Sequence, residues 1–298
     1  MDKTRILALV AVFMVHVIYG LTFTFANDVL AEGFIRPYGF LVIRVVGAAI
    51  LFWIFSLFTP KERIDPKDYM TIFFASVFGL ALNFLTFFKG LEFTTPIHAS
   101  VIMTVVPIVV LVLSAFFLKE RITSLKTAGI FLGFSGAIVL SIYGKSTQDI
   151  DQIPLGNLLI FINAVSYSIY LIIIKKLTNK YHPFTFIRWL FLFGSILVIP
   201  FGFNEFSQVA WTSFTPYITF SVAFVVVGAT FATYLLNPIA LRHLRASTVS
   251  TFLYIQPVVA SVFALFMGSD NIDMVKIVAA ILIFSGVYLV TKKPKLYR

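Results

Sequence analysis

Long apolar runs alternate with short polar breaks along the whole chain. A helix needs about 20 mostly apolar residues to cross the hydrocarbon core of a bilayer, and ten runs of about that length lie between clusters of charge, proline or small polar residues. The ten runs cover residues 5–27, 36–58, 69–91, 96–118, 124–143, 154–175, 184–203, 213–237, 246–267 and 272–291. The breaks are too short to hold a separate soluble domain. The pattern therefore predicts an all-α integral membrane protein with ten transmembrane helices.

The composition supports this prediction. Hydrophobic residues make up 59% of the 298 residues and charged residues 12%, whereas soluble proteins are roughly half apolar and about a quarter charged. The 35 Phe residues suit lipid-facing positions, so their abundance does not indicate an aromatic substrate. Cysteine is absent, which excludes disulfides and thiolate metal sites. We predict no metal, no other cofactor and no catalytic residue.

Basic residues are concentrated at alternate ends of the ten runs. One set of ends holds 17 Lys or Arg residues and the other set holds 3. The first set is Lys3, Arg5, Lys61, Arg63, Lys67, Lys119, Arg121, Lys126, Lys175, Lys176, Lys180, Arg242, Arg245, Lys292, Lys293, Lys295 and Arg298, and the second is Arg36, Lys145 and Lys276. Because Lys and Arg favour the cytoplasmic side, we expect a multi-pass protein of the cell membrane with both termini cytoplasmic. The net charge of +10 is thereby explained by the bilayer, so no nucleic acid partner is predicted.

A short segment of the first half recurs in the second half. LGFSGAIVLS at residues 132–141 matches LIFSGVYLVT at residues 282–291, an offset of 150. The same offset joins further identical pairs, namely Ser100 and Ser250, Pro107 and Pro257, Val112 and Val262, Phe116 and Phe266, and Ile122 and Ile272. Related halves that each contain an odd number of spans must enter the membrane from opposite sides. We therefore predict two inverted five-helix repeats, covering residues 1–146 and 152–298.

One part of this repeat resembles a known family. TTPIHASVIMTVVPIVVLVLSAFFLKERIT, residues 94–123, resembles the EamA-type signature of the drug/metabolite transporter superfamily, with a small polar start, a proline within the span and a closing Glu-Arg. The second copy, residues 245–272, keeps Pro257 but ends in Asp270-Asn271, which argues against identical roles for the two repeat ends. The resemblance implies a ten-helix secondary transporter and favours export of a small metabolite. We predict that the protein is not an enzyme.

Two ionisable side chains lie deep inside predicted spans, where a charge is costly and needs a reason. His16 lies close to the midplane with Tyr19 on the same helix face, and it could bind substrate or accept a proton. An interhelical hydrogen bond is the structural alternative. Arg44 could hold a substrate carboxylate or phosphate by paired hydrogen bonds, but it could equally snorkel outward or pair with a buried acid. Lys89 lies nearer the outer end of its span, where a structural role is favoured over a gate formed with Glu92.

Neutral polar residues add to these candidates. They are Asn83 on the third run, Asn163 and Tyr167 on the sixth, and Tyr254 and Gln256 on the ninth. Each alone is explained by helix packing, whereas together they favour a polar substrate cavity. Pro107 and Pro257 occupy equivalent positions, where they could act as hinges or simply form static kinks.

The leading interpretation is a secondary transporter that exports a small polar metabolite, such as an amino acid, by alternating access around a midplane cavity. Its predicted partners are the small-molecule substrate and the lipid bilayer, with protons as a possible coupling ion through His16. A phosphate-bearing metabolite exchanger that uses Arg44 and Lys89 is one alternative. An intramembrane lipid-handling protein is another, although neither paired acids nor a nucleophile with a base supports catalysis.

Overall fold

The computed structural model describes residues 3–31, 33–59, 61–94, 99, 102–142, 153–266 and 274–292, and every regular element in this part of the chain is helical. The α-helices are α1 (Lys3–Ala31), α2 (Pro37–Ser56), α3 (Pro66–Ser76), α4 (Leu82–Phe93), α6 (Val106–Leu118), α7 (Ser124–Ile142), α8 (Ile153–Thr178), α9 (Pro183–Ser207), α10 (Pro216–Ala223), α11 (Thr233–His243), α12 (Ala246–Thr251), α13 (Ile255–Phe266) and α14 (Met274–Thr291). Two π-helical segments, η1 (Val77–Ala81) and η3 (Phe224–Ala232), and two 3-10 turns, η2 (Trp211–Ser213) and η4 (Phe252–Tyr254), join some of them. The all-helical prediction is thus confirmed.

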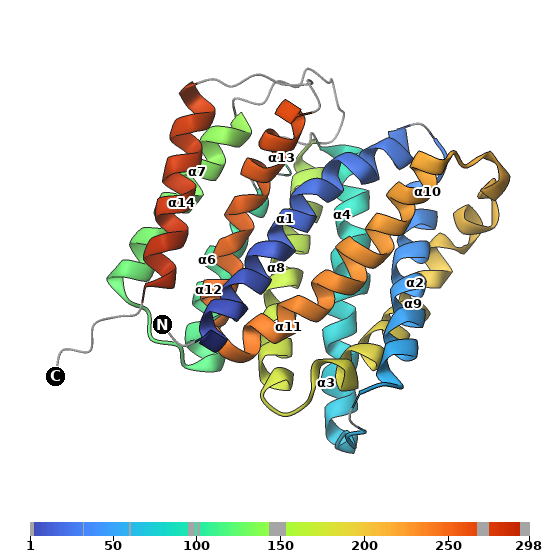
Figure 1. Ribbon diagram of the computed structural model, residues 1–298, viewed down its shortest axis with the longest axis horizontal. Helices are drawn as coiled ribbons and strands as arrows, with labels where there is room; N and C mark the ends of the chain where they lie inside the picture. Colours follow the sequence, from blue (N-terminus) through green and yellow to red (C-terminus); the bar gives the residue numbers. More distant parts are fainter. Residues whose placement is uncertain are drawn as a thin grey trace.

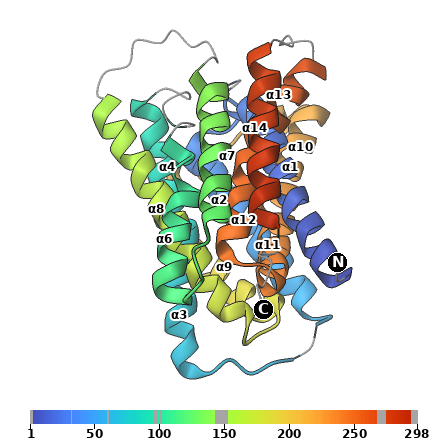
Figure 2. The same cartoon turned by 90° about the vertical axis from the view of Figure 1, so that its left-hand side faces the viewer.

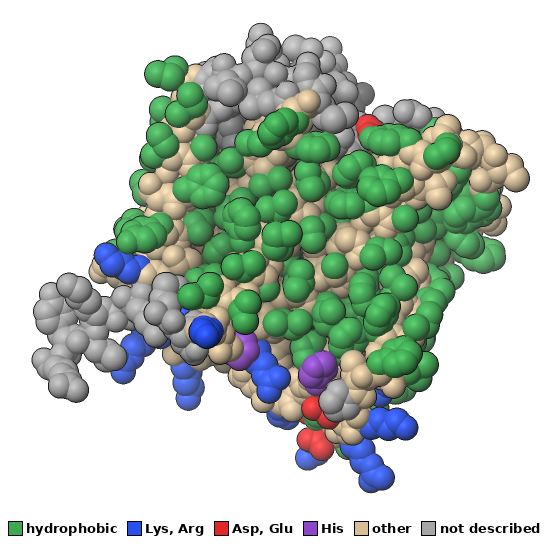
Figure 3. Space-filling model, in the orientation of Figure 1, with side chains coloured by type: hydrophobic (Ala, Val, Ile, Leu, Met, Phe, Trp, Pro, Cys, Tyr) green, Lys and Arg blue, Asp and Glu red, His purple; other side chains and the backbone are tan. Residues whose placement is uncertain are grey.

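Seven helical segments among the described residues are long and apolar enough to cross a membrane. They are Lys3–Thr22, Pro37–Ser56, Pro66–Phe93, Pro154–Thr178, Pro183–Ser207, Pro216–His243 and Ala246–Phe263. Three shorter apolar helices, Val106–Leu118, Ser124–Val139 and Ile277–Thr291, fall within the remaining predicted runs. Hydrophobic side chains cover the broad middle of the bundle (Figure 3). The number of crossings is therefore supported for seven runs and stays a prediction for three.

The bundle has a helix pair on each side and mixed packing between them. α7 lies along α14 on one side, and α2 lies along α9 on the other (Figures 1 and 2). Between these pairs, α1 packs on α11 and α13, while α8 packs on α4 and α6. The first span of each half is thus inserted against the later helices of the other half, and the two halves form one interlocked unit.

The contacts between the halves obey the 150-residue offset. A Cβ atom on Gly136 would lie 2.8 Å from the Ala279 carbonyl oxygen, and one on Gly129 would lie 2.7 Å from the Gly286 carbonyl oxygen. Adding 150 to Gly129 gives residue 279 and adding it to Gly136 gives residue 286, so each contact is the counterpart of the other. The axes of α7 and α14 approach closely because the three glycines, Gly129, Gly136 and Gly286, lack a side chain. Packing therefore explains the recurrent small residues of the two segments.

At each end of the α2–α9 pair, a carboxylate caps the start of one of the two helices. Glu205 accepts hydrogen bonds from the backbone N–H groups of Tyr38 (2.8 Å) and Gly39 (2.9 Å) at the start of α2. Glu62, which follows α2, accepts from the His182 N–H (2.7 Å) and the Thr185 hydroxyl (2.8 Å) at the start of α9. The first turn of a helix leaves N–H groups without internal partners, and an anion there is favourable. Reciprocal caps fix the two antiparallel helices against sliding.

Both candidate hinge prolines lie directly after an interruption of regular α-helix. Pro107 is the second residue of α6, which follows a turn at residues 104–105, and Pro257 is the third residue of α13, which follows the 3-10 turn η4. Proline is tolerated in a first helical turn, where its missing N–H costs nothing. The prolines thus mark breaks shared by both halves, and the hinge role stays a prediction.

Candidate functional site

Arg44 is the central feature of the site. Its side chain extends from the middle of α2 and is only 8% exposed. The Nε–H donates to the Thr230 hydroxyl at 3.2 Å, and the guanidinium carbon lies 4.9 Å from the centre of the Phe84 ring. Among the described residues, no carboxylate lies within ion-pair distance of it. Neither a paired acid nor an outward-snorkelling side chain therefore accounts for this arginine.

Two tyrosines, Tyr19 on α1 and Tyr234 on α11, lie near the arginine, and two more on α8 continue from Tyr234. Tyr19 and Tyr234 lie within electrostatic range of Arg44. The ring centres of Tyr170 and Tyr234 are 5.8 Å apart, and those of Tyr167 and Tyr170 are 5.9 Å apart. Tyr234 donates its hydroxyl hydrogen bond to the Gly79 carbonyl in η1 at 2.8 Å. Tyr167, Tyr170 and Tyr234 thus form a continuous aromatic layer between α8 and α11.

The π-helical segments lie at equivalent places in the two halves. Residues 77–81 become residues 227–231 when 150 is added, and these fall inside η3. π-helical turns are rare and occur frequently at functional sites. Both supply groups to the site, because Gly79 in η1 accepts from Tyr234 and Thr230 in η3 accepts from Arg44. Thr230 in turn donates to the Val225 carbonyl at 2.8 Å, which fixes its hydroxyl as an acceptor for the arginine.

Three asparagines complete the layer beneath the tyrosines. Asn83 and Asn163 bind each other's backbone, since the Asn83 side-chain N–H donates to the Asn163 carbonyl (3.3 Å) and the Asn163 side-chain N–H donates to the Asn83 carbonyl (2.6 Å). The Asn237 side chain lies close to Tyr167. The side-chain oxygens of Asn163 and Asn237 are buried and have no hydrogen-bond partner in the part of the chain that the structure describes.

His16 lies in the same region but is engaged with α12 and α13. The ring is 1% exposed, its Nδ1 lies 2.8 Å from the Gln256 side-chain nitrogen, and it also forms a hydrogen bond with the Val249 backbone. A side-chain amide nitrogen can only donate, so Nδ1 is the acceptor and the Val249 carbonyl is left to receive Nε2–H. The ring is neutral in this arrangement. The interhelical bond proposed as a structural alternative is present, and proton transfer through His16 stays a prediction.

Tyr254 is separated from the other candidates. Its hydroxyl donates to the Thr104 carbonyl at 3.0 Å, and its ring covers Gly133 on α7. It therefore packs α12–α13 against α6 and α7. Lys89 forms a half-exposed ion pair with Glu92 at 2.6 Å, so its charge is already partnered away from Arg44.

The sequence prediction included Arg44, Tyr19, Asn83, Asn163 and Tyr167, which the structure brings together. It missed four residues from the α10–α11 span, namely Thr230, Thr233, Tyr234 and Asn237. Their spacing of three, four and seven residues is that of one helix face. That polar stripe could therefore have been recognised in the sequence. Pro238, which follows Asn237 directly, gives less information about the site.

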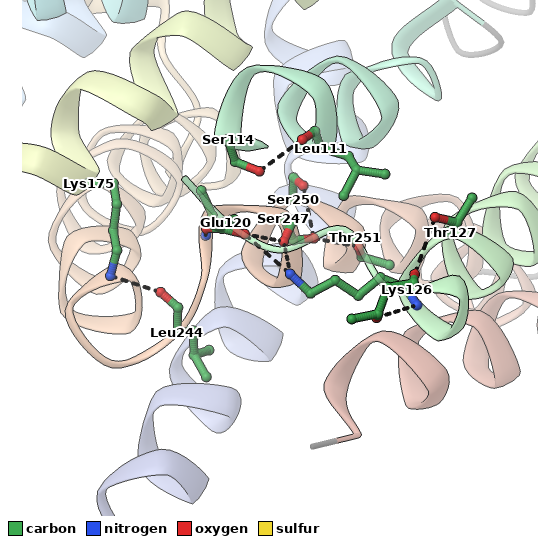
Figure 4. Close-up of polar contacts among 12 residues, drawn as sticks. Leu111, Ser114, Glu120, Lys126, Thr127, Lys175, Leu244, Ser247, Ser250 and Thr251 are labelled. Carbon is green, nitrogen blue, oxygen red and sulfur yellow. Dashed lines mark hydrogen bonds and ion pairs between the residues drawn. The ribbon is translucent and has the colours of Figure 1, made fainter. Parts of the chain in front are cut away.

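A second buried polar cluster lies at the basic end of the bundle (Figure 4). Glu120 accepts hydrogen bonds from the Ala246 N–H (2.8 Å) and the Ser247 hydroxyl (2.6 Å) at the start of α12. Lys126 lies 3.3 Å from the Glu120 carboxylate and 2.7 Å from the Ser247 oxygen. The Lys126 and Glu120 side chains are only 7% and 8% exposed. Glu120 of the family-like segment thus joins the first half to α12 of the second half.

Lys175 strengthens the same end of the bundle. Its ammonium group donates to the carbonyls of Leu241 and Leu244 at the end of α11, the latter at 3.1 Å. A cation is favourable at a helix C-terminus, where carbonyl groups lack internal partners. Arg5 likewise donates to the Thr291 carbonyl at 2.6 Å, which places the beginning of α1 beside the end of α14.

Comparisons with known proteins agree with this architecture. A model of the EamA-like transporter family matches residues 6–142 and again residues 154–292. An uncharacterized transporter of Archaeoglobus fulgidus is 29% identical over 293 residues, which span 98% of this chain and 100% of the relative. The uncharacterized transporter YoaV of Bacillus subtilis is 29% identical over 250 residues, 83% of this chain and 84% of the relative. A solved crystal structure superposes with a TM-score of 0.80 at 16% identity, covering 95% of this chain and 98% of its own, and so shares the fold.

The family match explains the long-range similarity within the chain. One family model fits each half separately, and together the two matches cover nearly the whole sequence. The resemblance first indicated by residues 94–123 is confirmed, and the apolar helices agree with a protein that crosses the membrane several times. The chain belongs to the EamA-like transporter family.

Proposed function

We propose that the protein is a secondary transporter that exports a small polar metabolite bearing a carboxylate, such as an amino acid. The observation that carries this proposal is Arg44, a buried cation at mid-membrane depth with no acidic partner among the described residues. Its remaining guanidinium N–H groups donate no further hydrogen bond there. Arginine presents paired donors whose geometry matches a carboxylate, and a buried charge in a membrane is retained for a function or a partner.

A carboxylate suits the site better than a phosphate. Arg44 provides one positive charge, and Lys89, which was needed for the exchanger of phosphate-bearing metabolites, is half-exposed and paired with Glu92. A phosphate that carries more than one negative charge would remain partly uncompensated beside a single arginine. The balance of charge thus favours a substrate with one acidic group.

Alternating access is the transport mechanism that we propose for this architecture. Two inverted five-helix repeats can exchange conformations, which opens a shared midplane site first to one side of the membrane and then to the other. The counterpart contacts of α7 with α14 and the equivalent π-helical segments support such an exchange. Lys and Arg side chains gather at the lower edge in Figure 3, so we place that end, with both termini, in the cytoplasm of the cell.

Coupling to protons through His16 is a separate part of the proposal. Protonating Nδ1 would set two donors against each other, because the Gln256 amide nitrogen lies 2.8 Å from it. The Gln256 amide would have to turn over so that its oxygen accepts from Nδ1–H, and the charge of His16 is thereby linked to the orientation of the Gln256 side chain on α13. A His16→Gln protein that keeps full pH-driven accumulation of substrate would contradict this coupling.

The transport experiment compares two arginines in proteoliposomes. Vesicles preloaded with a mixture of the standard amino acids, or with sugar phosphates, are assayed for exchange with external labelled compounds of the same class. Arg44→Gln should reduce amino acid exchange by about tenfold or more, since a charge-assisted bidentate bond is lost. Arg188→Gln is the matched control, because Arg188 stacks on Trp53 nearer a helix end. Wild-type exchange by Arg44→Gln, or exchange of sugar phosphates alone, would contradict the proposal.

A further inference from the structure

One arginine at the basic end of the bundle has no acidic partner. Arg188 lies in the second turn of α9, and its terminal Nη1 is 3.4 Å from the hydroxyl of Ser56, the last residue of α2. Its other terminal nitrogen, Nη2, forms no hydrogen bond with a described residue and remains accessible. No carboxylate of the described residues lies within ion-pair distance of Arg188. Its positive charge is therefore open to a partner from outside the protein.

Two tryptophans hold the Arg188 guanidinium group in place. Its central carbon lies 5.1 Å from the centre of a Trp53 ring and 6.0 Å from the centre of a Trp189 ring. The two tryptophans meet at 5.3 Å with their planes 73° apart, and Tyr69 on α3 adds a third ring, 5.2 Å from Trp189. Cation–π contacts with two rings restrict the arginine side chain, so its unused donors are held in position for a ligand.

The polar side-chain atoms of this cluster are mostly hydrogen-bond donors. The indole nitrogens of Trp53 and Trp189 and the Nε of Arg188 have no acceptor among the described residues. The Ser56 hydroxyl gives its own hydrogen to the Trp53 carbonyl at 2.7 Å. The Glu62 carboxylate, on the connection that follows α2, already accepts from two donors at the start of α9. One cation surrounded by donors favours an anion that accepts hydrogen bonds.

The cluster lies at the depth of the lipid headgroups. α9 has 25 residues and is about 37 Å long, which exceeds the hydrocarbon core of roughly 30 Å. Arg188 is the sixth residue of α9, and Trp53 lies three residues before the end of α2, at the same end of the bundle. Beside them on α3, the side chains of Met70 and Phe74 are 60% and 48% exposed, so they can contact acyl chains. The position therefore suits a lipid, whose phosphate and tails meet at this depth.

We propose that Arg188, held by Trp53 and Trp189, binds the phosphate of an anionic phospholipid such as phosphatidylglycerol. Arginine presents paired N–H donors that match two phosphate oxygens, and basic pockets between transmembrane helices bind anionic lipid headgroups. A phosphodiester with an uncharged headgroup carries one negative charge, which balances the one charge of Arg188. A zwitterionic lipid adds an ammonium group, which a cluster of donors disfavours. This lipid site is independent of the substrate proposed above.

The tryptophans of the cluster can report lipid binding. The chain has three tryptophans, so the change Trp211→Phe leaves Trp53 and Trp189 as the only indole fluorophores. The full-length protein with this change is placed in phosphatidylcholine vesicles, where a small fraction of the lipid carries bromine on its acyl chains. Bromine quenches tryptophan fluorescence on contact. The fraction of brominated lipid that gives half-maximal quenching should be about fivefold lower for phosphatidylglycerol than for phosphatidylcholine.

Three variants separate a specific site from general surface charge. Arg188→Gln should bring the ratio between the two lipids close to one, because the charge is lost while both tryptophans remain. Arg188→Lys keeps the charge without the paired donors and should retain part of the preference. Arg242→Gln is the matched control, since it removes the same charge from an exposed arginine on α11 at the same end, and it should keep the full ratio. Comparing the two lipids within each variant cancels any effect of the substitution on fluorescence itself.

Several results would overturn the lipid site. Equal quenching by both lipids in the parent protein would show an ordinary aromatic belt at the membrane interface. An unchanged ratio in Arg188→Gln, or an equal fall in Arg188→Gln and Arg242→Gln, would assign the preference to overall charge. Relief of quenching by inorganic phosphate, but not by sodium chloride of equal ionic strength, would assign the site to a soluble anion. Vesicles of phosphatidylcholine alone hold no anionic lipid, so Arg188→Gln remains a suitable control for the exchange assay there.

Discussion

The α2–α9 pair and the Glu120 cluster are both held by carboxylates, but in different ways. Glu62 and Glu205 cap helix starts at opposite ends of one pair, and neither needs a buried cation. Glu120 instead shares a nearly solvent-free site with Lys126 and binds the start of α12 in the other half. The first arrangement favours a frame of fixed geometry. The second concentrates charge at a single contact between halves, which suits a closure that would be broken in each cycle of the alternating access proposed above.

Removing the Glu120 charge should have the largest effect. Glu120→Gln leaves Lys126 buried without its anion, which typically costs about 3–5 kcal/mol, so the basic end of the bundle should open more often. The chain has no cysteine, and a single Thr251→Cys change therefore reports exposure through its rate of thiol labelling. Glu120→Gln should raise that rate.

The double variant sharpens this expectation. Replacing both partners, by Glu120→Gln with Lys126→Met, should recover much of the stability, because no unpaired charge remains buried. A labelling rate that is the same in the wild type and both variants would show that the cluster is only structural.

Loss of one helix cap should have an intermediate effect. Glu205→Gln or Glu62→Gln removes a charged acceptor for two donors, and we expect each to reduce the free energy of unfolding by about 1–2 kcal/mol. The rate of thiol labelling at position 251 should stay unchanged. Chemical denaturation measures the first quantity. A faster labelling rate in either variant would contradict the distinction between frame and closure.

The smallest effect should come from the Lys180–Asp68 pair, in which the lysine side chain is 56% exposed and the aspartate side chain 13%. A hydrogen bond with Asp68 raises the pKa of Lys180 above its ordinary value. The pair therefore stabilises the fold below the ordinary lysine pKa, and this contribution is lost as the pH rises through the raised value. Asp68→Asn should lower the Lys180 pKa in NMR titration of labelled lysine, with little change in unfolding at neutral pH.

The spans and the duplicated halves could be predicted because each depends on a property of many residues. A run of about 20 apolar residues indicates a crossing whatever its neighbours are, and the recurrence from Ser100 to Gly286 indicates related halves without any knowledge of contacts. Arg44 could also be named as a candidate from its sequence position, because a charge deep in a span is costly wherever the helix faces.

Which side chains meet at the candidate site could not be predicted in the same way. Tyr254 and Tyr234 both lie well inside spans, yet Tyr254 packs toward α7 whereas Tyr234 lies beside Arg44. The spacing of a regular α-helix also gives the wrong side-chain directions after η1 and η3, because a π-helical segment rotates every later side chain about the helix axis. The direction in which Asn237 points relative to the residues before η3 therefore depends on a backbone irregularity that apolar periodicity does not reveal.

The hydrogen bond from Tyr254 to Thr104 joins positions separated by 150 residues, the offset between the halves. Each residue thus occupies the other's place in the repeat, and the contact lies where the two halves meet on their common axis. If the halves trade conformations during transport, this residue pair is mapped onto itself. It can act as a pivot about which the bundle rocks. A change at either residue should alter the speed of the exchange in both directions alike, without favouring one side of the membrane.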